Sequence, residues 1–588
     1  MKEIIIGIDL GTTNSAVAFV KNGVPQIIPI DGQPTMPSCV GLDPTGKLVV
    51  GAAARNMLIV APESTVLSVK RLMGEPTRIR LGEKLFSPEE ISSFILRRLK
   101  EEAEAFLGTP IQKAVITVPA FFDEKQRKAT KDAGSLAGLD VVRIINEPTA
   151  AALAYSVGSS AVERVLVYDL GGGTFDVSVV LIENGVVEVK ASRGDTHLGG
   201  DDFDQLLVDH VRQDFQRKEG LALDESLKTA RRLKVSLERA KCQLTDLPYV
   251  RVEEDYVQEN RHLQLELERE TFERLVSSHL HKTLQCVHES IKDAGLSVRD
   301  LSKVLLVGGA TRSPVIHRLL LESLGQHPRS EVNPDLIVAL GASVCAANIA
   351  GEQIHAILVD IAAHTLSVGC LYQTDLGPEL RCSPILRRNT PLPATKAEIF
   401  RTVFDEQEEV EVSVYEGEGL YPEENTLVGR FMISGLAKVP EGNPVLATLS
   451  LDLSGLLKVT AMEKLTGLSK TVAMDIHEKN GSFDLESART NMQGLLRDSA
   501  PDSTSPTQQP PPAPERTTAA PAHEALLSEA KDLRQRAEAL LAGNLTPEDA
   551  ADVREHLLGS AASISAENWK KLRDHTEALS DLVFYLED

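Results

Sequence analysis

Cysteine pairs, tryptophan and long apolar runs are scarce or missing in this 588-residue chain. Its six cysteines never form a C-x-x-C pair, so neither a zinc site nor a disulfide framework is indicated. No run of eighteen apolar residues suggests a membrane span. The start, Met1-Lys2-Glu3, lacks the apolar core of a signal peptide. We therefore expect a cytoplasmic protein without a membrane partner.

Basic residues are outnumbered by acidic ones. The chain has 62 Lys and Arg against 85 Asp and Glu, a net charge of −23. A protein that binds nucleic acid phosphates would carry the opposite sign, so we expect no nucleic-acid partner. Hydrophobic residues make up 42%, which is ordinary for globular cores, and the length leaves room for several domains.

The strongest chemical signal is the stretch Asp169-Leu170-Gly171-Gly172-Gly173-Thr174-Phe175-Asp176. An apolar run precedes it and another follows it, which predicts a buried hairpin. Three consecutive glycines leave backbone N–H groups open to an oxyanion, and the two aspartates suit a magnesium ion held through water. A plain glycine hairpin with stray acids is the other interpretation, and this stretch alone does not decide between them.

The N-terminus repeats that layout. The stretch Ile8-Asp9-Leu10-Gly11-Thr12-Thr13-Asn14-Ser15 also joins two apolar runs through Asp-Leu-Gly and small hydroxyl residues. Asp9 and Asp169 lie 160 positions apart (169 − 9), as do Gly11 and Gly171. Such self-similarity predicts two related lobes. Two facing lobes, each with an aspartate and a small-residue turn, would grip a polyphosphate from both sides.

Between the two turns, local signals predict ordinary elements and two ambiguous residues. Ser87-Pro88-Glu89-Glu90 is typical of a helix start, and residues 114–119 predict a buried strand. Lys70 is of a type that usually lies on the surface. Glu147, at the start of a small-residue helix, is either a partner of the helix dipole or a carboxylate facing the water shell of a metal.

Four ordered motifs together resemble the DnaK-type heat-shock chaperone family (heat shock protein 70). They are the stretches around Asp9 and Asp169, then Asn146-Glu147-Pro148-Thr149-Ala150-Ala151 and Val307-Gly308-Gly309-Ala310-Thr311-Arg312. Residues 4–480 carry the resemblance, and the short connection from Gly74 to Ser87 is similar to an HscC-like branch. The resemblance implies an actin-like, two-lobed α/β ATPase domain, then an antiparallel β-sandwich, then a small helical module. No P-loop motif occurs.

The resemblance also implies a site for ATP or ADP with Mg²⁺, and K⁺ as a further candidate ion. The implied nucleotide contacts are Gly11, Thr12, Thr13, Asn14, Gly171, Gly172, Gly173, Thr174, Glu238, Lys241, Thr245, Gly308, Gly309, Ala310, Arg312 and Asp335. The implied catalytic residues are Lys70, Glu147, Asp169 and Thr174, and those around the metal's water shell are Asp9, Asp169 and Asp176. Such positioning and charge neutralisation suit phosphoryl transfer.

Two details of this site are expectations in their own right. Asp169 is the first choice for taking the proton of the attacking water, with Thr174 or a solvent relay as alternatives. Cys242 stands where some relatives place an arginine against the adenine face. We therefore expect base stacking to be weaker by ~1 kcal/mol, from the size of cation–π contacts.

By the same resemblance, residues 1–353 form the ATPase domain, 354–364 the interdomain linker and 365–480 the peptide-binding β-sandwich. The apolar segment 357–361 alone favours a buried strand; in the family, such a linker docks on the ATPase domain when ATP is bound. Asp360 and Arg143 match positions that engage a J-domain partner. Ala362-Ala363 replaces the family's Thr-Pro, which makes the coupling geometry less certain.

From Thr365 to about Ile476 the pattern changes to alternating strands. Residues 410–414 alternate strictly, and Ser454-Gly455 predicts a hairpin turn. The implied groove would hold an extended peptide by main-chain hydrogen bonds and an apolar pocket. Its candidate residues are Val368, Leu371, Phe400, Val403, Val410 and Val412, with Leu371 and Val403 as an arch over the peptide. Plain core packing is the alternative for each.

The C-terminal part departs from the family pattern. Residues 481–500 are expected as a short helical extension, 501–522 as a disordered Pro-rich linker and 523–588 as a helical lid-like module. Seven prolines between Pro501 and Pro521 prevent a helix or a core. The amphipathic spacing of Leu526, Ala530, Leu533, Ala537 and Leu540 predicts a helix. A shortened lid, a docking module and a partner-binding tail all stay open.

These features predict an ATPase that acts as a molecular chaperone. It would bind exposed apolar segments of unfolded proteins, release them on ATP binding, and be reset by hydrolysis, with a J-domain co-chaperone and a nucleotide-exchange factor as partners. The alternative is a nucleotide-gated regulatory protein with one dedicated partner, suggested by the unusual tail and the replaced Thr-Pro. A filament former or sugar kinase is a third class, for which the β-sandwich has no use.

Overall fold

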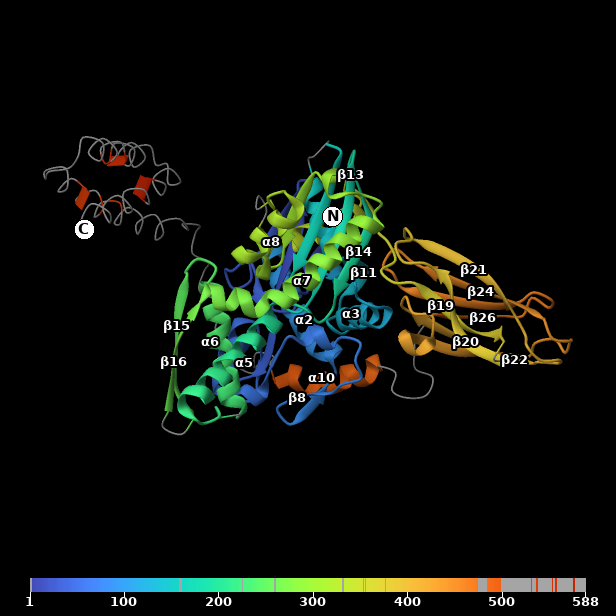
Figure 1. Ribbon diagram of the computed structural model, residues 1–588, viewed down its shortest axis with the longest axis horizontal. Helices are drawn as coiled ribbons and strands as arrows, with labels where there is room; N and C mark the ends of the chain where they lie inside the picture. The colour runs from blue at the N-terminus through green and yellow to red at the C-terminus, as the bar shows by residue number, and fades with distance from the viewer. Residues whose placement is uncertain are drawn as a thin grey trace, which may run out of the picture. The chain divides into compact units, whose positions relative to one another are not determined.

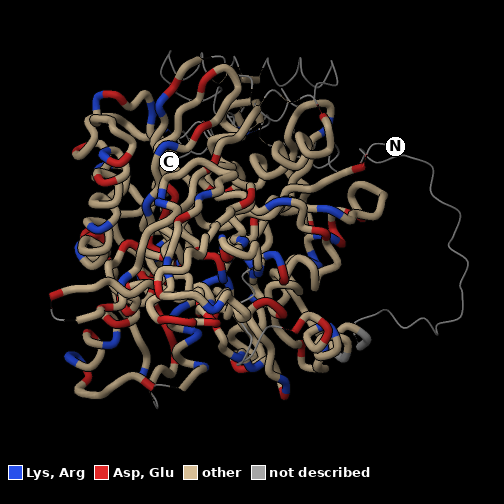
Figure 2. The backbone as a smooth tube through the Cα atoms, turned by 90° about the vertical axis from the view of Figure 1, so that its right-hand side faces the viewer, with Lys and Arg blue, Asp and Glu red and all other residues tan. Residues whose placement is uncertain are grey.

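The computed structural model describes residues 3–157, 161–224, 226–258, 261–329, 333–352, 354, 356–375, 377–473 and 484–498, with isolated positions between 530 and 576. Contacts divide the chain into two units, residues 1–500 and 501–588. The first unit holds two α/β lobes, followed by a β-sandwich (Figure 1). Acidic and basic residues are interspersed along the chain (Figure 2).

The first lobe is built on a sheet with the order β11-β10-β1-β2-β3, in which β4 also pairs with β2. Its strands are β1 (Ile5–Asp9), β2 (Asn14–Lys21), β3 (Val24–Ile28), β4 (Met36–Pro37), β10 (Lys113–Val118) and β11 (Asp140–Asn146). Around it lie α1 (Ala52–Val60), α2 (Pro88–Leu107), α3 (Glu124–Leu136), the sheet β5 (Cys39–Leu42), β6 (Leu48–Val50), β7 (Thr65–Leu67), and the hairpin β8 (Ile79–Leu81), β9 (Lys84–Phe86). Ser87 caps α2 in a capping box with Glu90, which confirms the predicted helix start.

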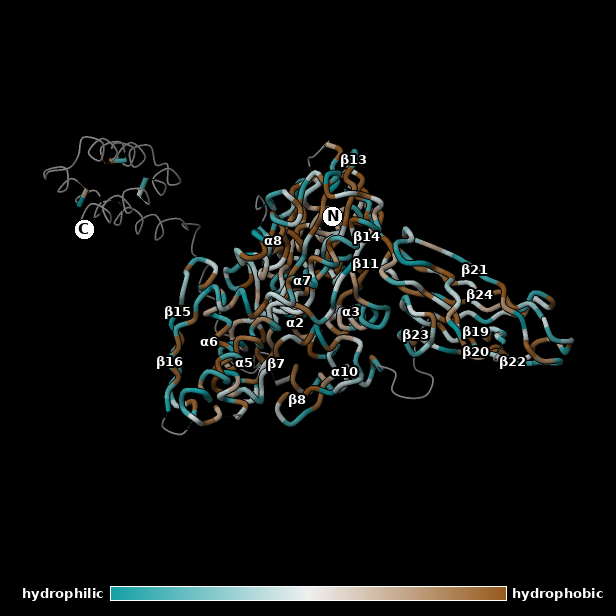
Figure 3. Tube along the Cα trace, viewed as in Figure 1, coloured by the Kyte–Doolittle hydropathy of each residue, from teal (hydrophilic) through white to brown (hydrophobic). Residues whose placement is uncertain are grey.

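The second lobe has a sheet of order β17-β12-β13-β14-β18. Its strands are β12 (Glu163–Leu170), β13 (Phe175–Glu183), β14 (Val186–Asp195), β17 (Lys303–Val307) and β18 (Ile357–Val359). Its other elements are α5 (Gly200–Glu219), α6 (Leu227–Gln243), the hairpin β15 (Tyr249–Gln258), β16 (Arg261–Glu268), α7 (Arg269–Asp293) and α8 (Pro314–Leu324). The apolar character of the strands around β13 and β14 is visible in Figure 3.

The two lobes repeat one strand arrangement, which confirms the predicted repeat. β1 pairs with β10 in parallel and with β2 antiparallel, and β12 pairs with β17 and β13 in the same two ways. Helices α4 (Glu147–Ser156) and α9 (Ile337–Ile349) share one apolar cluster with strands of both sheets. A Cβ built on Gly341 would lie 1.7 Å from Ala150 O, so this helix contact requires glycine.

The β-sandwich consists of two antiparallel sheets, as the alternation predicts. One has the order β20-β19-β22-β23, and the other β21-β24-β25-β26. The strands are β19 (Leu366–Thr374), β20 (Gly377–Leu386), β21 (Ala394–Arg401), β22 (Glu409–Glu416), β23 (Thr426–Ser434), β24 (Pro444–Leu451), β25 (Leu457–Glu463) and β26 (Ser469–Ala473). The predicted turn at Ser454-Gly455 joins β24 to β25, with Leu451 opposite Leu457.

Strand alternation separates two of the predicted pocket residues, Val368 and Leu371. Along β19 the register is regular from Val368 to Leu371, so side chains three positions apart point to opposite faces. Val368 is 4% exposed and belongs to the core between the sheets, whereas Leu371 is 49% exposed. Val368 and Leu371 therefore point to opposite faces of the sheet, and the assignment of Leu371 to the arch stays a prediction.

The predicted linker lies on the second lobe. β18 pairs in parallel with β14 at the edge of that sheet. Asp360, directly after β18, is buried and accepts a hydrogen bond from Asn146 Nδ2 at 3.0 Å and from the Ile361 N–H at 2.9 Å. The two interpretations of residues 357–361, as a buried strand and as a linker docked on the ATPase domain, are thus compatible, because the segment docks by pairing as a strand.

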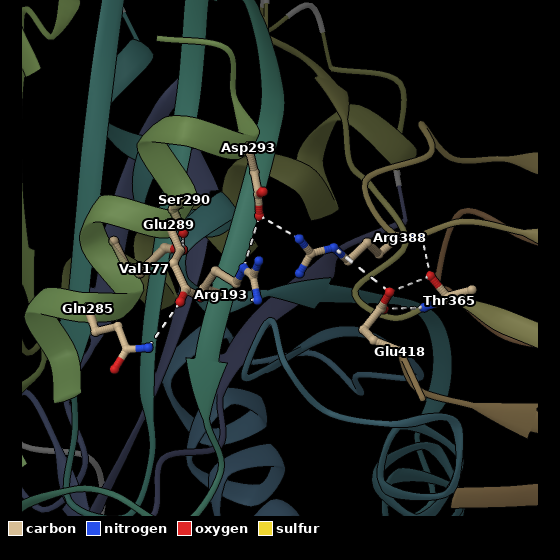
Figure 4. Close-up of polar contacts among 9 residues, drawn as sticks. All are labelled: Val177, Arg193, Gln285, Glu289, Ser290, Asp293, Thr365, Arg388 and Glu418. Carbon is tan, nitrogen blue, oxygen red and sulfur yellow. Dashed lines mark hydrogen bonds and ion pairs between the residues drawn. The ribbon is translucent and has the colours of Figure 1, made fainter. Parts of the chain in front are cut away.

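Polar contacts and one helix join the β-sandwich side of the chain to the lobes. Arg388, in the β20–β21 connection, donates to Asp293 Oδ2 at 2.9 Å, and Arg193 of β14 donates to the same oxygen at 2.9 Å (Figure 4). Ile144 N donates to Ser454 Oγ at 3.2 Å. Helix α10 (Leu485–Asp498) buries Met492 in the core of the first lobe, and its Asn491 donates to Glu90 Oε1.

Only a few positions of the second unit are described. Ala530, Leu533 and Ala537 are helical and buried, in line with the predicted amphipathic spacing. The remaining predictions for the tail, including residues 501–522, lie outside the described residues. Within the part of the chain that the structure describes, no helix is long and apolar enough to cross a membrane.

Candidate nucleotide-binding site

The two glycine turns meet across the cleft between the lobes. Residues 10–13 join β1 to β2, and residues 171–174 join β12 to β13 with Asp169 opposite Asp176. A Cβ built on Gly172 would lie 1.9 Å from Thr13 Oγ1, and one on Gly173 would lie 2.7 Å from Thr12 Cγ2. The lobes approach this closely only because both positions are glycine. The structure therefore brings the predicted phosphate turns together.

A third glycine segment completes this wall of the cleft. The N–H groups of Gly200 and Asp201, at the start of α5, donate to Gly171 O at 2.9 Å and Gly172 O at 2.7 Å. These bonds fix the carbonyl side of the 171–174 turn. Within the turn, the Gly171 N–H donates to Thr174 O at 3.1 Å.

Four carboxylates gather beside the turns: those of Asp9, Glu147, Asp169 and Asp176. Asp176 is 1% exposed and accepts the backbone N–H groups of Ala120 and Phe121, each at 3.1 Å. Thr117 Oγ1 donates to Asp9 Oδ1 at 3.1 Å. Removal from water, followed by the charge of Glu147, raises the pKa of Asp9 and of Asp176 to about 7, and the same causes raise the pKa of Asp169.

Lys70 lies inside this cluster, so the surface interpretation of this lysine is wrong. The short 3₁₀ helix Val69–Leu72 begins after Ser68, which has a φ of 53°. This turn directs Lys70 into the cleft, where it is 3% exposed and its Nζ pairs with Glu147 Oε1. Glu147 is the first residue of α4, as predicted. Removing either partner of such a buried pair would leave an uncompensated charge, so Glu147 holds Lys70 in the cleft.

The charges of this cluster fit a bound cation. With all groups ionised, four carboxylates and one ammonium leave a net charge of −3 (1 − 4). Asp169 Oδ2 is buried without a hydrogen-bond partner among the described residues. In the same part of the chain, no three His, Cys, Asp or Glu side chains are grouped closely enough to hold a metal ion directly. Magnesium, which keeps most of its waters, suits such an arrangement.

The predicted base contacts come from α6 and from the turn after β17. Glu238 and Lys241 lie on α6, paired with Arg55 of the first lobe at 2.9 Å and with Asp204 at 2.8 Å. Cys242 is exposed beside them, and Thr245 follows the end of the helix.

The glycine turn after β17 completes this side of the site. Gly308 has a φ of 83°, and a Cβ there would lie 2.4 Å from Leu170 O, so only glycine fits. The short 3₁₀ helix Gly309–Arg312 follows, and Arg312 pairs with Asp335 at 2.6 Å. The turn thus lies against the strand that carries Asp169.

Comparisons with known proteins show which family the chain resembles. The family model described as Hsp70 protein matches residues 5–79 and 76–584. The chaperone protein DnaK of Thermotoga neapolitana is 41% identical over 503 residues, which cover 82% of this chain and 82% of that protein. The chaperone proteins DnaK of Thermotoga petrophila and Thermotoga maritima are each 42% identical over 491 residues, 80% of either chain.

The chain belongs to the Hsp70 family. Membership confirms the actin-like ATPase lobes, the β-sandwich, and ATP hydrolysis with Mg²⁺. It also confirms the prediction of an ATP-dependent chaperone that binds unfolded polypeptides and works with co-chaperones. Nothing in the comparisons favours the regulatory alternative, and the HscC-like branch stays a prediction.

The predicted peptide-pocket residues of this Hsp70 separate into two groups. Val368 and Val412 are buried in the core between the sheets, and Phe400 and Val410 pack against that core. Val403, just after β21, is 40% exposed. Val368, Val410 and Val412 share one face of their sheet, and the peptide pocket itself stays a prediction.

Sequence reasoning missed several residues that organise the site. Thr117 holds Asp9, Arg55 reaches Glu238 from the opposite lobe, and Asp204 holds Lys241. Only Thr117 left a signal, as a single hydroxyl in an apolar strand. Arg55 and Asp204 look like ordinary helix-surface charges in the sequence, because their partners lie 183 and 37 positions away (238 − 55 and 241 − 204).

Proposed function

We propose that this Hsp70 hydrolyses ATP between the two closed glycine turns, with the γ-phosphate beside Lys70. The observation that carries the proposal is the buried Lys70–Glu147 pair within a cluster of acids, directly beside two turns whose lobes meet through glycine. Backbone N–H groups of residues 11–14 and 171–174 bind the phosphates. Glu238, Lys241, Thr245, Gly308, Gly309, Ala310, Arg312 and Asp335 bind the adenosine.

Each polar group then has a definite task. Lys70 neutralises charge that develops on the γ-phosphate, and Glu147 holds Lys70 in place. Asp169, whose Oδ2 has no protein partner among the described residues, takes a proton from the attacking water. Thr174 orients that water. Asp9, Asp169 and Asp176 would hold Mg²⁺ through its waters, and the ion would supply charge neutralisation on the phosphates. K⁺ is a further candidate beside them.

We further propose that ATP binding is transmitted to the β-sandwich through the linker. The proposed boundaries are 1–353 for the ATPase domain, 354–364 for the linker, 365–480 for the sandwich, 481–500 for a helical extension, 501–522 for a Pro-rich linker and 523–588 for a lid-like module. Apolar client segments bind at Phe400, Val403 and Val410. Asn146, next to Glu147, donates to Asp360 of the linker, and this bond connects the two sites.

The same linker region supports the proposed partners. A J-domain co-chaperone is proposed to act at Arg143 and Asp360. Asp360 is buried, and Arg143 Nε is buried without a hydrogen-bond partner among the described residues. A partner that moves this pair would loosen the linker. A nucleotide-exchange factor and a cytoplasmic location complete the proposal.

The test is the release of a fluorescent apolar peptide from the full chain, followed with and without ATP. We expect ATP to speed release at least ~10-fold, since a smaller factor would be less than the 1.4 kcal/mol of a useful coupling. A chain lacking residues 485–588 separates the role of the tail from that of the sandwich. Tight peptide binding with a release rate indifferent to ATP would refute the proposed coupling.

A further inference from the structure

Two acidic side chains lie together where the β-sandwich meets the first lobe, with Glu124 buried and Glu416 half-buried. Glu124, the first residue of α3, accepts the backbone N–H of Leu457 of β25 at 2.9 Å through its Oε1. The backbone N–H of Glu124 in turn donates to Glu416 Oε2 of β22 at 3.2 Å. Glu124 is 6% exposed. Both contacts cross from the lobe to the sandwich, so the docked arrangement itself buries this pair.

The surroundings of the pair offer little compensating charge. Arg127, one turn along α3, directs its guanidinium to Phe122 O, Ala120 O and Asn146 Oδ1. His364, before β19, has its Nε2 on Phe121 O at 3.1 Å. The other charged groups facing the pair are Asp123 at the start of α3 and Asp452 in the β24–β25 turn. A cavity of about 20 Å³, lined by Glu124, Glu416, Arg127 and His364 among others, has room for about one water.

We propose that docking of the β-sandwich on the first lobe takes up a proton at the Glu124–Glu416 pair, so that the docked form is favoured at lower pH. Two neighbouring carboxyl groups, with two further acids and few free cations around them, cannot both stay ionised without cost. A proton on one carboxyl removes the repulsion and leaves an oxygen to accept the Leu457 N–H.

The direction of the pH dependence follows from linkage. Burial, then the charge of Glu416, raises the pKa of Glu124 to about 8 in the docked form, and burial raises the pKa of Glu416 as well. In the undocked form, Glu124 at an exposed helix end has an ordinary pKa near 4.5. Between about pH 4.5 and pH 8, docking is therefore accompanied by uptake of a proton. The docking constant falls up to about tenfold per pH unit as pH rises through this window, and levels off above pH 8.

The experiment measures docking itself rather than client binding, although the inference rests on the proposed ATP-driven docking. Small-angle scattering of the full chain, saturated with a slowly hydrolysed ATP analogue, gives the docked fraction between pH 6 and 8.5. We expect the parent to lose docking as pH rises. Glu124→Gln keeps an acceptor for Leu457 but cannot ionise, so its docked fraction should be high and flat across the range.

Two further variants separate this device from general weakening of the interface. Arg388→Gln removes the Asp293 contact, and because arginine stays charged over the whole range, it should lower docking by a similar factor at every pH. Glu416→Gln removes the neighbouring charge and should dock more tightly than the parent at pH 8. Circular dichroism melts at pH 7 verify that each variant is folded.

Three outcomes would overturn the inference. They are a parent whose docked fraction is independent of pH, a Glu124→Gln variant that keeps the parent's slope, and an Arg388→Gln variant that flattens it. The second would transfer the titration to another group. Absence of any ATP-driven compaction would instead count against the proposed coupling of the two domains, and is distinguishable because it affects every variant at every pH.

Discussion

The two glycine turns of the ATPase lobes are alike in backbone and unlike in charge. Each turn joins two antiparallel strands and follows an aspartate. In each lobe, the strand that carries this aspartate also pairs with a parallel strand, β10 or β17. Asp9, however, has its Oδ1 held by Thr117, whereas Asp169 keeps a buried oxygen without a partner among the described residues. The second turn also ends in Asp176, and the equivalent position of the first turn, 160 residues earlier, is Ala16.

This difference shows how a symmetric fold can support an asymmetric reaction. The second lobe supplies two carboxylates, and the first supplies the groups that tie them in place. Asp176 accepts both its backbone bonds from residues 120 and 121 of the first lobe. The first lobe also supplies Lys70. The chemistry therefore needs both lobes closed, although neither turn by itself is unusual.

Removing the cation of the first lobe should have the largest effect. We expect Lys70→Ala to lower ATP turnover by about 10³-fold, because loss of a group that stabilises developing charge typically costs 10²–10³. ATP affinity should change by only a few fold, since the glycine turns remain. Single-turnover hydrolysis with nucleotide titration measures both quantities. Turnover at the parent rate would remove Lys70 from the reaction.

Replacing each of the two equivalent aspartates by asparagine tests the asymmetry directly. Asp169→Asn should reduce the single-turnover rate by about 10², the usual size of a general-base contribution. Asp9→Asn should cost less, because the carboxylate of Asp9 is already engaged by Thr117. Equal losses for the two variants would mean that the turns act as equivalents, against the proposed role of Asp169.

Alanine substitutions of the glycines in the two turns should have different effects on ATP affinity and melting temperature. The Cβ of Gly172→Ala would strike Thr13 of the opposite lobe, whereas that of Gly11→Ala would lie 2.0 Å from Asn14 O within its own turn. We expect Gly172→Ala to lower ATP affinity by about tenfold, or 1.4 kcal/mol, with little change in melting temperature. Gly11→Ala should lower both. Calorimetric titration and thermal melts compare them, and a destabilised Gly172→Ala would contradict a purely cross-cleft role.

The contact between Arg55 and Glu238 should have the smallest effect. Their side chains are 38% and 25% exposed, and such pairs contribute about 0–1 kcal/mol. Arg55→Gln should therefore speed ADP release by no more than about fivefold, and less so at high salt. Stopped-flow release of a fluorescent ADP at two ionic strengths measures this, and an effect independent of salt would speak against an ionic cause.

Much of the fold follows from local pattern. The hairpin 163–183, the capped helix after Ser87 and the strand pairing around Ser454-Gly455 need only alternation, turn glycines and capping residues. Part of the candidate site could also be predicted from local sequence, because Asp9, Gly11, Asp169 and Gly172 belong to contiguous motifs. Lys70, Arg55 and Asp204 were beyond local reasoning, since nothing near them in sequence shows what they will face.

By itself, the sequence determined that two similar strand–turn–strand units each carry an aspartate and glycine-rich backbone N–H groups. It also determined that residues 365–480 form antiparallel strands. Only the tertiary structure decided which residues these units face. Closure of the lobes buried Lys70 against Glu147, left Asp169 Oδ2 without a partner among the described residues, and placed Val368 and Leu371 on opposite faces of a sheet. The reason is physical: backbone conformation depends on neighbouring residues, whereas burial and charge pairing depend on residues brought together from far apart in the chain.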